Sequence, residues 1–214
     1  MKVAILGTGD VGRAIGNGFI ALGHDVKMGS RAAGNEKAKA WVASAGSKAS
    51  EGTFADAVAG ADLIVLAVLG NATEDVIKAA GAGNFKGKIV WDAGNPLDFS
   101  GGGPALSIVG HDSLGERTQK WVPDAHVVKV FNTVGNALMF KPQLPGGPPD
   151  MFIAGNDDGA KTKTTALLKD FGWNTVDVGG IECSRYLEAM CLAWVHIGIK
   201  TGKWMHAYKL LRAD

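Results

Sequence analysis

The sequence predicts an α/β protein of the Rossmann type, with a doubly wound, mainly parallel sheet and a short helical extension at the C-terminus. Short apolar runs alternate with segments of helical periodicity, and this βαβαβ order predicts parallel strands joined by right-handed crossovers. A glycine-rich turn, Gly7–Gly12, follows the first apolar run and opens the first helical segment. The chain has 31 glycines in 214 residues without a collagen repeat, which indicates tight turns and close backbone approaches.

The first half of the chain contains the most regular elements. Leu63–Val68 is uniformly apolar, as expected of a strand covered on both faces, and Thr53 is suited to cap the helix that follows it. The expected strands are Lys2–Leu6, Asp25–Met28, Leu63–Val68 and Lys88–Asp92, and the expected helices are Val11–Leu22, Asn35–Ala45, Thr53–Ala59 and Thr73–Ala80.

The second half is less regular. Glycine and proline predict loops at Gly101–Pro104 and Leu144–Pro149. The expected strands are Val127–Phe131, Met151–Ala154 and Trp173–Val178, and the expected helices are Ser113–Trp121, Asp157–Phe171, one that begins at Glu182 and a final one over Lys203–Leu211. We therefore expect one Rossmann domain over residues 1–181, with residues 182–214 packed on it as a helical extension.

Charge and composition exclude several classes of protein. With 22 basic and 21 acidic residues the net charge is +1, so the chain lacks the basic character of a nucleic-acid-binding protein. The longest apolar stretch, Leu63–Leu69, is far too short to cross a bilayer. Cys183 and Cys191 stand too far apart on one expected helix to form a disulfide, and we expect them in the core. The expected protein is cytoplasmic, with no nucleic-acid, membrane or metal partner.

The turn after the first strand fits the dinucleotide-binding pattern G-x-G-x-x-G. The first glycine permits the tight turn, the second lets the backbone approach a pyrophosphate, and the third lets the helix pack closely on the strand. The helix N-terminus then offers free N–H groups and the positive end of its dipole to the phosphates. The residues expected to border the pyrophosphate are Gly7, Thr8, Gly9, Asp10, Val11 and Gly12. The charge of Asp10 favours a capping role over direct contact.

The residues after the second expected strand decide which dinucleotide binds. An acidic side chain there would bind the ribose 2′-hydroxyl of NAD, whereas an arginine can hold the 2′-phosphate of NADP through two hydrogen bonds. The chain has Ser30 and Arg31 at this position, with no acidic residue beside them. Ser30 and Thr8 can each donate a hydroxyl hydrogen bond, and Lys37 can approach as a point charge. The sequence therefore predicts a preference for NADP(H).

Several segments together carry a family resemblance. Ile5–Arg13 with Gly29-Ser30-Arg31 resembles the NADPH-binding domain of F420-dependent NADP oxidoreductases, and equally the cytosolic reductase domain of the STEAP ferric reductases. The segments Asp92–Leu97, Val127–Thr133, Ala154–Asp157 and Ala207–Leu211 are similar to further parts of the same group, so the resemblance covers nearly the whole chain. It implies hydride transfer between NADPH and a flavin, FMN or FAD, or the 5-deazaflavin coenzyme F420.

The resemblance also implies roles for individual residues. Thr8, Ser30 and Arg31 match contacts to the 2′-phosphate, and Ala67, Val68 and Leu69 match the segment that borders the nicotinamide ribose. Asn95 and Asn132, with the adjacent Thr133, match positions near the nicotinamide and the acceptor ring.

Two departures from the family leave the acceptor open. Val68-Leu69-Gly70 stands where many relatives have Pro-Trp or a histidine facing the acceptor. Asn132 stands where the F420 enzymes tend to carry histidine, which brings the chain closer to the flavin-using branch.

Transfer of a hydride between two rings needs positioning more than acid–base catalysis, so no catalytic acid or base is expected. Asn95 and Asn132 follow strands, at the edge where ligands bind in open α/β sheets, and their amides can orient a carboxamide or form Asx turns. Two alternatives stay open: an NADPH-dependent imine or carbonyl reductase, and a non-catalytic NADP(H)-sensing module. An apolar stripe after Glu182 (Leu187, Met190, Cys191, Trp194 and Ile197) is expected to lie in the core or to form a homodimer.

Overall fold

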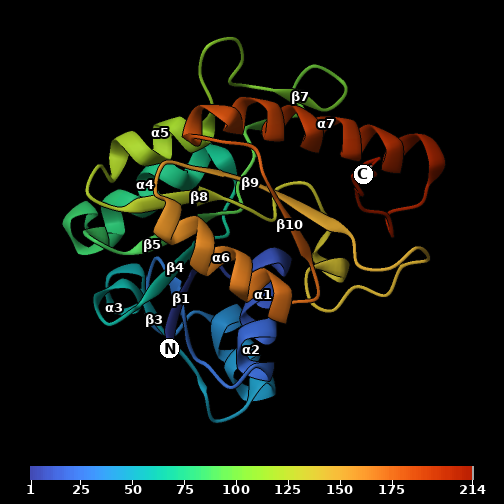
Figure 1. Cartoon of the computed structure of the whole chain (residues 1–214). Coiled ribbons are helices and arrows are strands. Elements are labelled where there is room, and N and C mark those ends of the chain that lie inside the picture. The colour runs from blue at the N-terminus through green and yellow to red at the C-terminus, as the bar shows by residue number, and fades with distance from the viewer. Residues whose placement is uncertain (214) are drawn as a thin grey trace.

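Strand β1 (Lys2–Leu6) lies inside an eight-stranded sheet whose strand order reverses beside it (Figure 1). From edge to edge the sheet contains β10 (Asn174–Asp177), β9 (Asp150–Gly155), β8 (His126–Lys129), β5 (Ile89–Asp92), β4 (Leu63–Leu66), β1, β2 (Asp25–Ser30) and β3 (Ala49–Thr53). Neighbouring strands are parallel except β8 and β9, which pair antiparallel. The computed structural model describes residues 1–213, and its mainly parallel sheet confirms the predicted Rossmann fold class.

Helices cover both faces of the sheet (Figure 1). They are α1 (Asp10–Ala21), α2 (Glu36–Ala45), α3 (Phe54–Ala59), α4 (Thr73–Ala80), α5 (Leu114–Trp121), α6 (Asp158–Asp170) and α7 (Ser184–Thr201). Helices α1, α2 and α6 contribute to the core on one face, and α3 and α4 to the core on the other. Thr53 caps α3 as predicted, because its hydroxyl accepts a hydrogen bond from the Asp56 N–H at 3.1 Å.

Aromatic side chains fill the first of these cores. The rings of Phe19 and Phe171 lie 4.8 Å apart, and those of Trp91 and Phe131 lie 5.6 Å apart. The indole of Trp91 is fully buried and donates to the Thr164 hydroxyl at 2.9 Å. Burial of each such side chain contributes about 1.5–3 kcal/mol, so this cluster holds α1 and α6 firmly on the sheet.

The carboxyl ends of the parallel strands meet at one edge of the sheet, on the side away from the N-terminus (Figure 1). Helix α7 crosses the molecule on that side. A small hairpin, β6 (Leu97–Asp98) and β7 (Ala105–Leu106), extends from the chain after β5 and contacts α7. Ligands of open α/β sheets bind at this edge, at the point where the strand order reverses.

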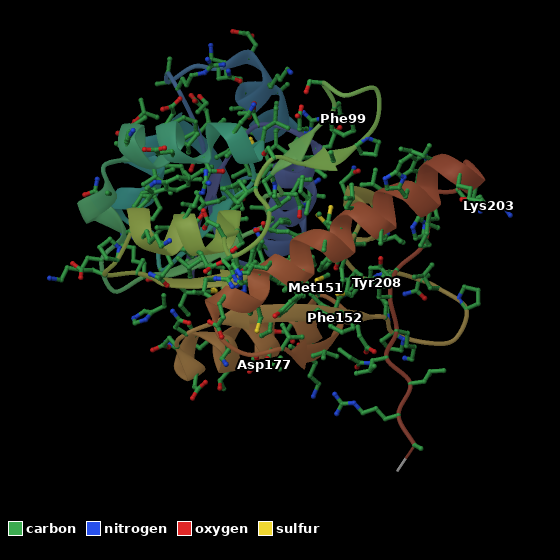
Figure 2. All side chains as sticks on the ribbon, turned by 90° about the horizontal axis from the view of Figure 1, so that it is seen from above. Phe99, Met151, Phe152, Asp177, Lys203 and Tyr208 are labelled. Carbon is green, nitrogen blue, oxygen red and sulfur yellow. The ribbon has the colours of Figure 1, made fainter. Side chains whose placement is uncertain are left out.

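The C-terminal segment differs from the prediction, because no helix forms over Lys203–Leu211. Gly202, with φ of 67°, ends α7 in the left-handed conformation, and the Trp204 ring then packs over Gly198. The backbone beyond it follows β9, where the Asp150 N–H donates to the Tyr208 carbonyl at 3.0 Å. Figure 2 shows Tyr208 beside Phe152 of β9, with their ring centres 6.5 Å apart. The sequence prediction also missed β3 and the β6–β7 hairpin.

No helix within residues 1–213 combines the length and the apolar character needed to cross a bilayer.

Candidate dinucleotide site

The glycine-rich turn after β1 is shaped by close backbone contacts. Gly7 has φ of 127°, and a Cβ atom there would lie 2.3 Å from the Ala67 carbonyl oxygen. A Cβ atom on Gly12 would lie 2.5 Å from the Gly7 carbonyl oxygen, so α1 packs directly on the turn. A Cβ atom on Gly9, in contrast, would meet nothing within 4 Å. Gly9 precedes α1 and faces open space, as expected where a pyrophosphate approaches a helix N-terminus.

An arginine in the first turn of α1 holds this turn in place. The Arg13 guanidinium donates to the Thr8 carbonyl at 3.1 Å and pairs with the Asp10 carboxylate. Asp10 is therefore the partner of Arg13 and does not cap α1, which corrects the expectation for it. Val11, the remaining residue of the motif, lies half-buried against the core. Sequence reasoning missed Arg13, although its three-residue spacing from Asp10 is typical of helical ion pairs.

The loop after β2 forms a second part of the site, and the Gly7 N–H donates to the Gly29 carbonyl at 3.2 Å to join the two. Ser30 is buried, and its hydroxyl donates to the Ala32 carbonyl at 2.6 Å. Arg31 is exposed. The ion pairs that arginines form within residues 1–213 involve other arginines, so the Arg31 guanidinium stays available to an anion.

The same loop continues into α2. The Gly34 N–H donates to the Glu51 carboxylate of β3 at 3.0 Å, which fixes the turn after Arg31. Asn35 caps α2 by accepting hydrogen bonds from the Lys37 and Ala38 N–H groups. The Lys37 side chain is exposed in the first turn of the helix. Arg31 lies in the loop that leads into α2, and Lys37 lies in the first turn of that helix. Two cations near a helix N-terminus suit the binding of an anion.

The connection after β4 lies between the glycine-rich turn and the turn after β5. The Ala67 carbonyl contacts the Gly7 position, and a Cβ atom on Gly70 would lie 2.3 Å from the Asn95 carbonyl oxygen. Between these contacts, Val68 is half-buried and Leu69 is 78% exposed. The structure therefore brings the segment 67–69 beside both the pyrophosphate turn and Asn95.

Asn95 and Asn132 bind each other across the ends of β5 and β8, and we call them the amide pair. The Asn95 side-chain NH₂ donates to the Asn132 carbonyl at 2.9 Å, and the Asn132 side-chain NH₂ donates to Asn95 Oδ1 at 3.0 Å. The Asn132 NH₂ also donates to the Leu187 carbonyl of α7 at 2.9 Å. Asn132 and Thr133 are buried, so Asn95 is the half-buried member that borders the surface.

Two features of the amide pair mark a site under constraint. The residue before Asn132, Phe131, has φ of 59°, which is uncommon for a bulky side chain. The Asn132 Oδ1 atom is buried and has no hydrogen-bond donor among the described residues. Both features lie at the carboxyl edge where the nicotinamide half of a dinucleotide would reach.

Three charged side chains, Asp92, Lys129 and Glu188, are buried together next to the amide pair, and we call them the buried triad. The Lys129 ammonium lies 3.0 Å from the Asp92 carboxylate and 2.8 Å from the Glu188 carboxylate, and all three side chains are at most 1% exposed. Burial lowers the pKa of Lys129, but the two carboxylates outweigh burial and raise this pKa above its ordinary value. No local pattern in the sequence indicates that Lys129 and Glu188 meet in the fold.

No titratable side chain forms a hydrogen bond to the amide pair within the described chain. The two tyrosines are accounted for: the Tyr208 hydroxyl donates to the Met190 carbonyl at 2.9 Å, and Tyr186 is exposed on α7. Cys191 is a buried thiol in the core of α7, and burial raises its pKa to about 12. Cys183 ends a turn before α7 and is half-buried, which corrects the expectation that both cysteines lie on one helix in the core; both thiols are free.

Cavities elsewhere do not coincide with these residues. One of about 300 Å³ lies near the amino-terminal ends of β1 and β2, and another of about 470 Å³ lies beside His126 and Asp157. Within residues 1–213, no group of three or more histidine, cysteine or acidic side chains converges as a metal site would require.

Comparison with known proteins shows which family the chain belongs to. A family model for coenzyme F420-dependent NADP oxidoreductases matches residues 2–96. The chain is 38% identical to a protein from Arthrobacter sp. FB24 described as a candidate F420-dependent NADP-reductase, and its crystal structure superposes with a TM-score of 0.93, covering 99% of this chain and 100% of that one.

Two more distant relatives are informative. The rat metalloreductase STEAP3 is 28% identical over 193 residues, which make up 89% of this chain and 36% of the relative, so the chain spans little more than a third of that protein. A reductive aminase from Aspergillus terreus, solved with NADPH and ethyl levulinate, is 19% identical with a TM-score of 0.68 over 94% of this chain and 62% of that one, a likeness of fold. The chain belongs to the coenzyme F420-dependent NADP oxidoreductase family.

Proposed function

We propose that this protein transfers a hydride between NADPH and a flavin-type ring, either coenzyme F420 or FMN or FAD. The observation that carries the proposal is that the carboxyl edge of the sheet has two chemically different ends. At one end lie an open glycine turn and an arginine that forms no ion pair with residues 1–213. At the other end lie uncharged amides that have no titratable partner among the same residues. The first end suits a phosphorylated dinucleotide, and the second suits chemistry that moves no proton through the protein.

The residues present fit NADPH. The N–H groups at the start of α1 and the turn around Gly9 would hold the pyrophosphate, since no side chain occupies that space. Arg31 would bind the 2′-phosphate, supported by Ser30 and Lys37. Segment 67–69 would border the nicotinamide ribose. When bound, NADPH supplies the hydride, and the amide pair would orient its carboxamide.

Exposed apolar side chains on the same edge favour a flat acceptor. Leu69 follows β4, Phe99 lies in the loop of the β6–β7 hairpin, and Val109 follows that hairpin, and these side chains are 78%, 61% and 70% exposed. Figure 2 shows Phe99 on the hairpin, away from the body of the sheet. An aromatic ring system would cover such surface, whereas a small carbonyl compound would leave most of it in water.

The direct experiment follows the absorbance of NADPH with each acceptor in turn. We expect oxidation with coenzyme F420, FMN or FAD, with ferric chelates included because of the likeness to STEAP3. If NADPH is oxidised only with imines or carbonyl compounds, the proposal is wrong and the protein is a reductase of those substrates, which would need a proton donor. Tight NADPH binding without oxidation by any acceptor would indicate a sensing module.

The cofactor preference is tested at Arg31. We expect Arg31→Ala to weaken NADPH binding about ten- to hundredfold while leaving NADH binding nearly unchanged, because a charge-assisted hydrogen-bonded contact contributes about 1.5–3 kcal/mol. Calorimetry with both dinucleotides measures this. Lys86→Ala is the matched control, because it removes an exposed cation before β5, at the opposite edge of the sheet. Equal loss of affinity for both dinucleotides, or no loss, would contradict the assignment of Arg31.

A further inference from the structure

The buried triad needs an explanation beyond stability. Removing charged groups from water is costly, and replacement of a buried ion pair by apolar side chains of similar size is often neutral or stabilising. Asp92 and Lys129 occupy paired positions of β5 and β8, at the last residue of each strand. An apolar pair there would satisfy the core, which is apolar at the preceding positions of both strands. The contacts of the three charged side chains with the surrounding backbone show what they position.

The triad forms hydrogen bonds to the turn that contains Asn95. Asp92 accepts a hydrogen bond from the Gly94 N–H at 2.9 Å, and the Lys129 ammonium donates to the Gly94 carbonyl at 2.8 Å. The Gly94 carbonyl belongs to the peptide bond that leads into Asn95. Both polar backbone groups of Gly94 are thus fixed by the triad, and the Asn95 side chain starts from a backbone with little freedom.

The triad also determines where α7 lies. The Glu188 carboxylate accepts hydrogen bonds from the Leu114 and Gly115 N–H groups, both at 3.0 Å, and so occupies the N-terminus of α5. The residue before it on α7, Leu187, accepts the hydrogen bond from the Asn132 amide. Adjacent residues of α7 therefore belong to the triad and bind the amide pair. A shift of α7 would move the triad and the amide pair together.

We infer that the buried triad is a positioning unit for hydride transfer, which fixes the amide pair where the nicotinamide carboxamide binds. The inference rests on the proposed function. Hydride transfer requires reacting atoms about 3–3.5 Å apart, and a misplacement of about 1 Å can lower the rate a hundredfold. A support that cannot relax, made of charges and backbone hydrogen bonds, meets that requirement better than apolar contacts that can repack.

The test replaces two members of the triad together. The double variant Lys129→Met with Asp92→Asn removes one positive and one negative charge, so the net charge of the buried group does not change. Glu188 loses its ion pair with Lys129 but keeps its two N–H donors on α5. The new asparagine can still accept from Gly94, but the bond to the Gly94 carbonyl is lost. We expect kcat to fall about tenfold or more. We also expect the primary isotope effect with NADPH deuterated at C4 to rise, because hydride transfer becomes slower relative to the other steps.

A matched control separates positioning from stability. Thr164→Val removes the buried hydrogen bond to Trp91. Trp91 precedes Asp92 on β5, but its side chain points to the other face of the sheet, into the core that α1, α2 and α6 cover. We expect this variant to lower the melting temperature and to leave kcat and the isotope effect unchanged. If the double variant behaves like this control, the triad is structural and the inference is overturned. If the double variant does not fold, Glu188→Gln takes its place with the same two expected changes.

A binding measurement decides the inference even if the wild-type protein oxidises no NADPH, the result by which the proposed function itself fails. Adenosine 2′,5′-bisphosphate contacts only the adenosine half of the site, whereas NADP⁺ reaches both halves. We expect the double variant to bind the bisphosphate as the wild type does and NADP⁺ several-fold more weakly. Unchanged affinity for both ligands, without a change in turnover, would show that the triad does not position the nicotinamide half.

Discussion

Two of the three glycines in the turn after β1 are required by the backbone around them, and Gly9 is not. The closest atoms to an added Cβ at Gly7 and Gly12 are carbonyl oxygens, which cannot move aside. Gly9 has φ of −78°, a conformation open to any residue, and space in front of it. This difference separates the contribution of the motif to folding from its contribution to binding.

We therefore expect Gly9→Ala to keep the melting temperature and to weaken NADPH binding. A methyl group in the path of the pyrophosphate should cost about 1–3 kcal/mol, which corresponds to about a ten- to hundredfold rise in the dissociation constant. Thermal unfolding and calorimetry on one preparation measure both quantities. Gly12→Ala is the comparison and should lower the melting temperature. A Gly9→Ala protein with unaltered affinity would show that the pyrophosphate does not lie at this turn.

The residues of the site differ in how far the sequence could reveal them. Gly7, Gly9 and Gly12 form one local motif, and the structure gives each the steric surroundings that the motif implies. Lys129 and Glu188 meet across 59 positions of sequence, and no local pattern predicts that contact. One signal was present: a lysine within an apolar strand can be buried only with a partner.

At the scale of the elements, one ion pair joins α5 to α7. The Glu116 carboxylate accepts hydrogen bonds from Arg185 at 2.6 and 2.8 Å, and from the Ser113 hydroxyl at 2.7 Å. These partners, Arg185 first, lower the pKa of Glu116 below its ordinary value of 4.5. A lowered pKa in the folded state means that the pair stabilises the protein above the pKa of the unfolded state, and that this stabilisation disappears as the pH falls through the folded-state pKa.

Wild-type protein should consequently lose stability as the pH falls below 4.5, and Glu116→Gln should lose less over the same range. The difference between them should amount to about 1 kcal/mol, since both side chains of the pair are partly solvated. Urea unfolding at a series of pH values gives the two curves. Parallel curves would show that the link between α5 and α7 does not depend on the charge of Glu116.

The elements with local start signals were the ones that the sequence located best. Helix α2 begins directly after Asn35, which caps it, and α5 begins directly after Ser113, whose hydroxyl accepts from the Glu116 N–H. Strand β3 was missed because its sequence is polar and lacks alternation, and backbone pairing with β2 forms it. The segment after Gly202 contains good helix-forming residues, but tertiary contacts of Trp204 and Tyr208 hold it extended along β9.

At the scale of the whole molecule, exposed apolar side chains collect on α7 and the segment after it. Among them Leu211 is 84% exposed; the full set is Tyr186, Ile197, Ile199, Trp204, Met205, Leu210 and Leu211. The stripe on α7 was expected to lie in the core or in a dimer, and the structure places Leu187, Cys191 and Trp194 in the core. Ile197, the last residue of the stripe, is 43% exposed.

We expect this surface to pair with a second copy of the chain, because isolated proteins seldom leave large apolar patches in water. Sedimentation velocity should show a dimer, and Ile199→Glu should shift it toward the monomer. Val109→Glu is the control, since Val109 is as exposed but follows the hairpin, outside this patch. A wild-type protein that sediments as a monomer would remove the basis for a dimer through α7.

The reversal of strand order beside β1 has a consequence for how such an enzyme could change during evolution. Every side chain assigned to the adenosine phosphate comes from the chain before α3, whereas the amide pair, the buried triad and α7 all come after it. The residues that choose between NADPH and NADH and the residues that position the reacting rings are thus encoded in separate stretches of the gene. A lineage could exchange the later stretch and acquire a new oxidant while it continues to draw on the same cellular reductant.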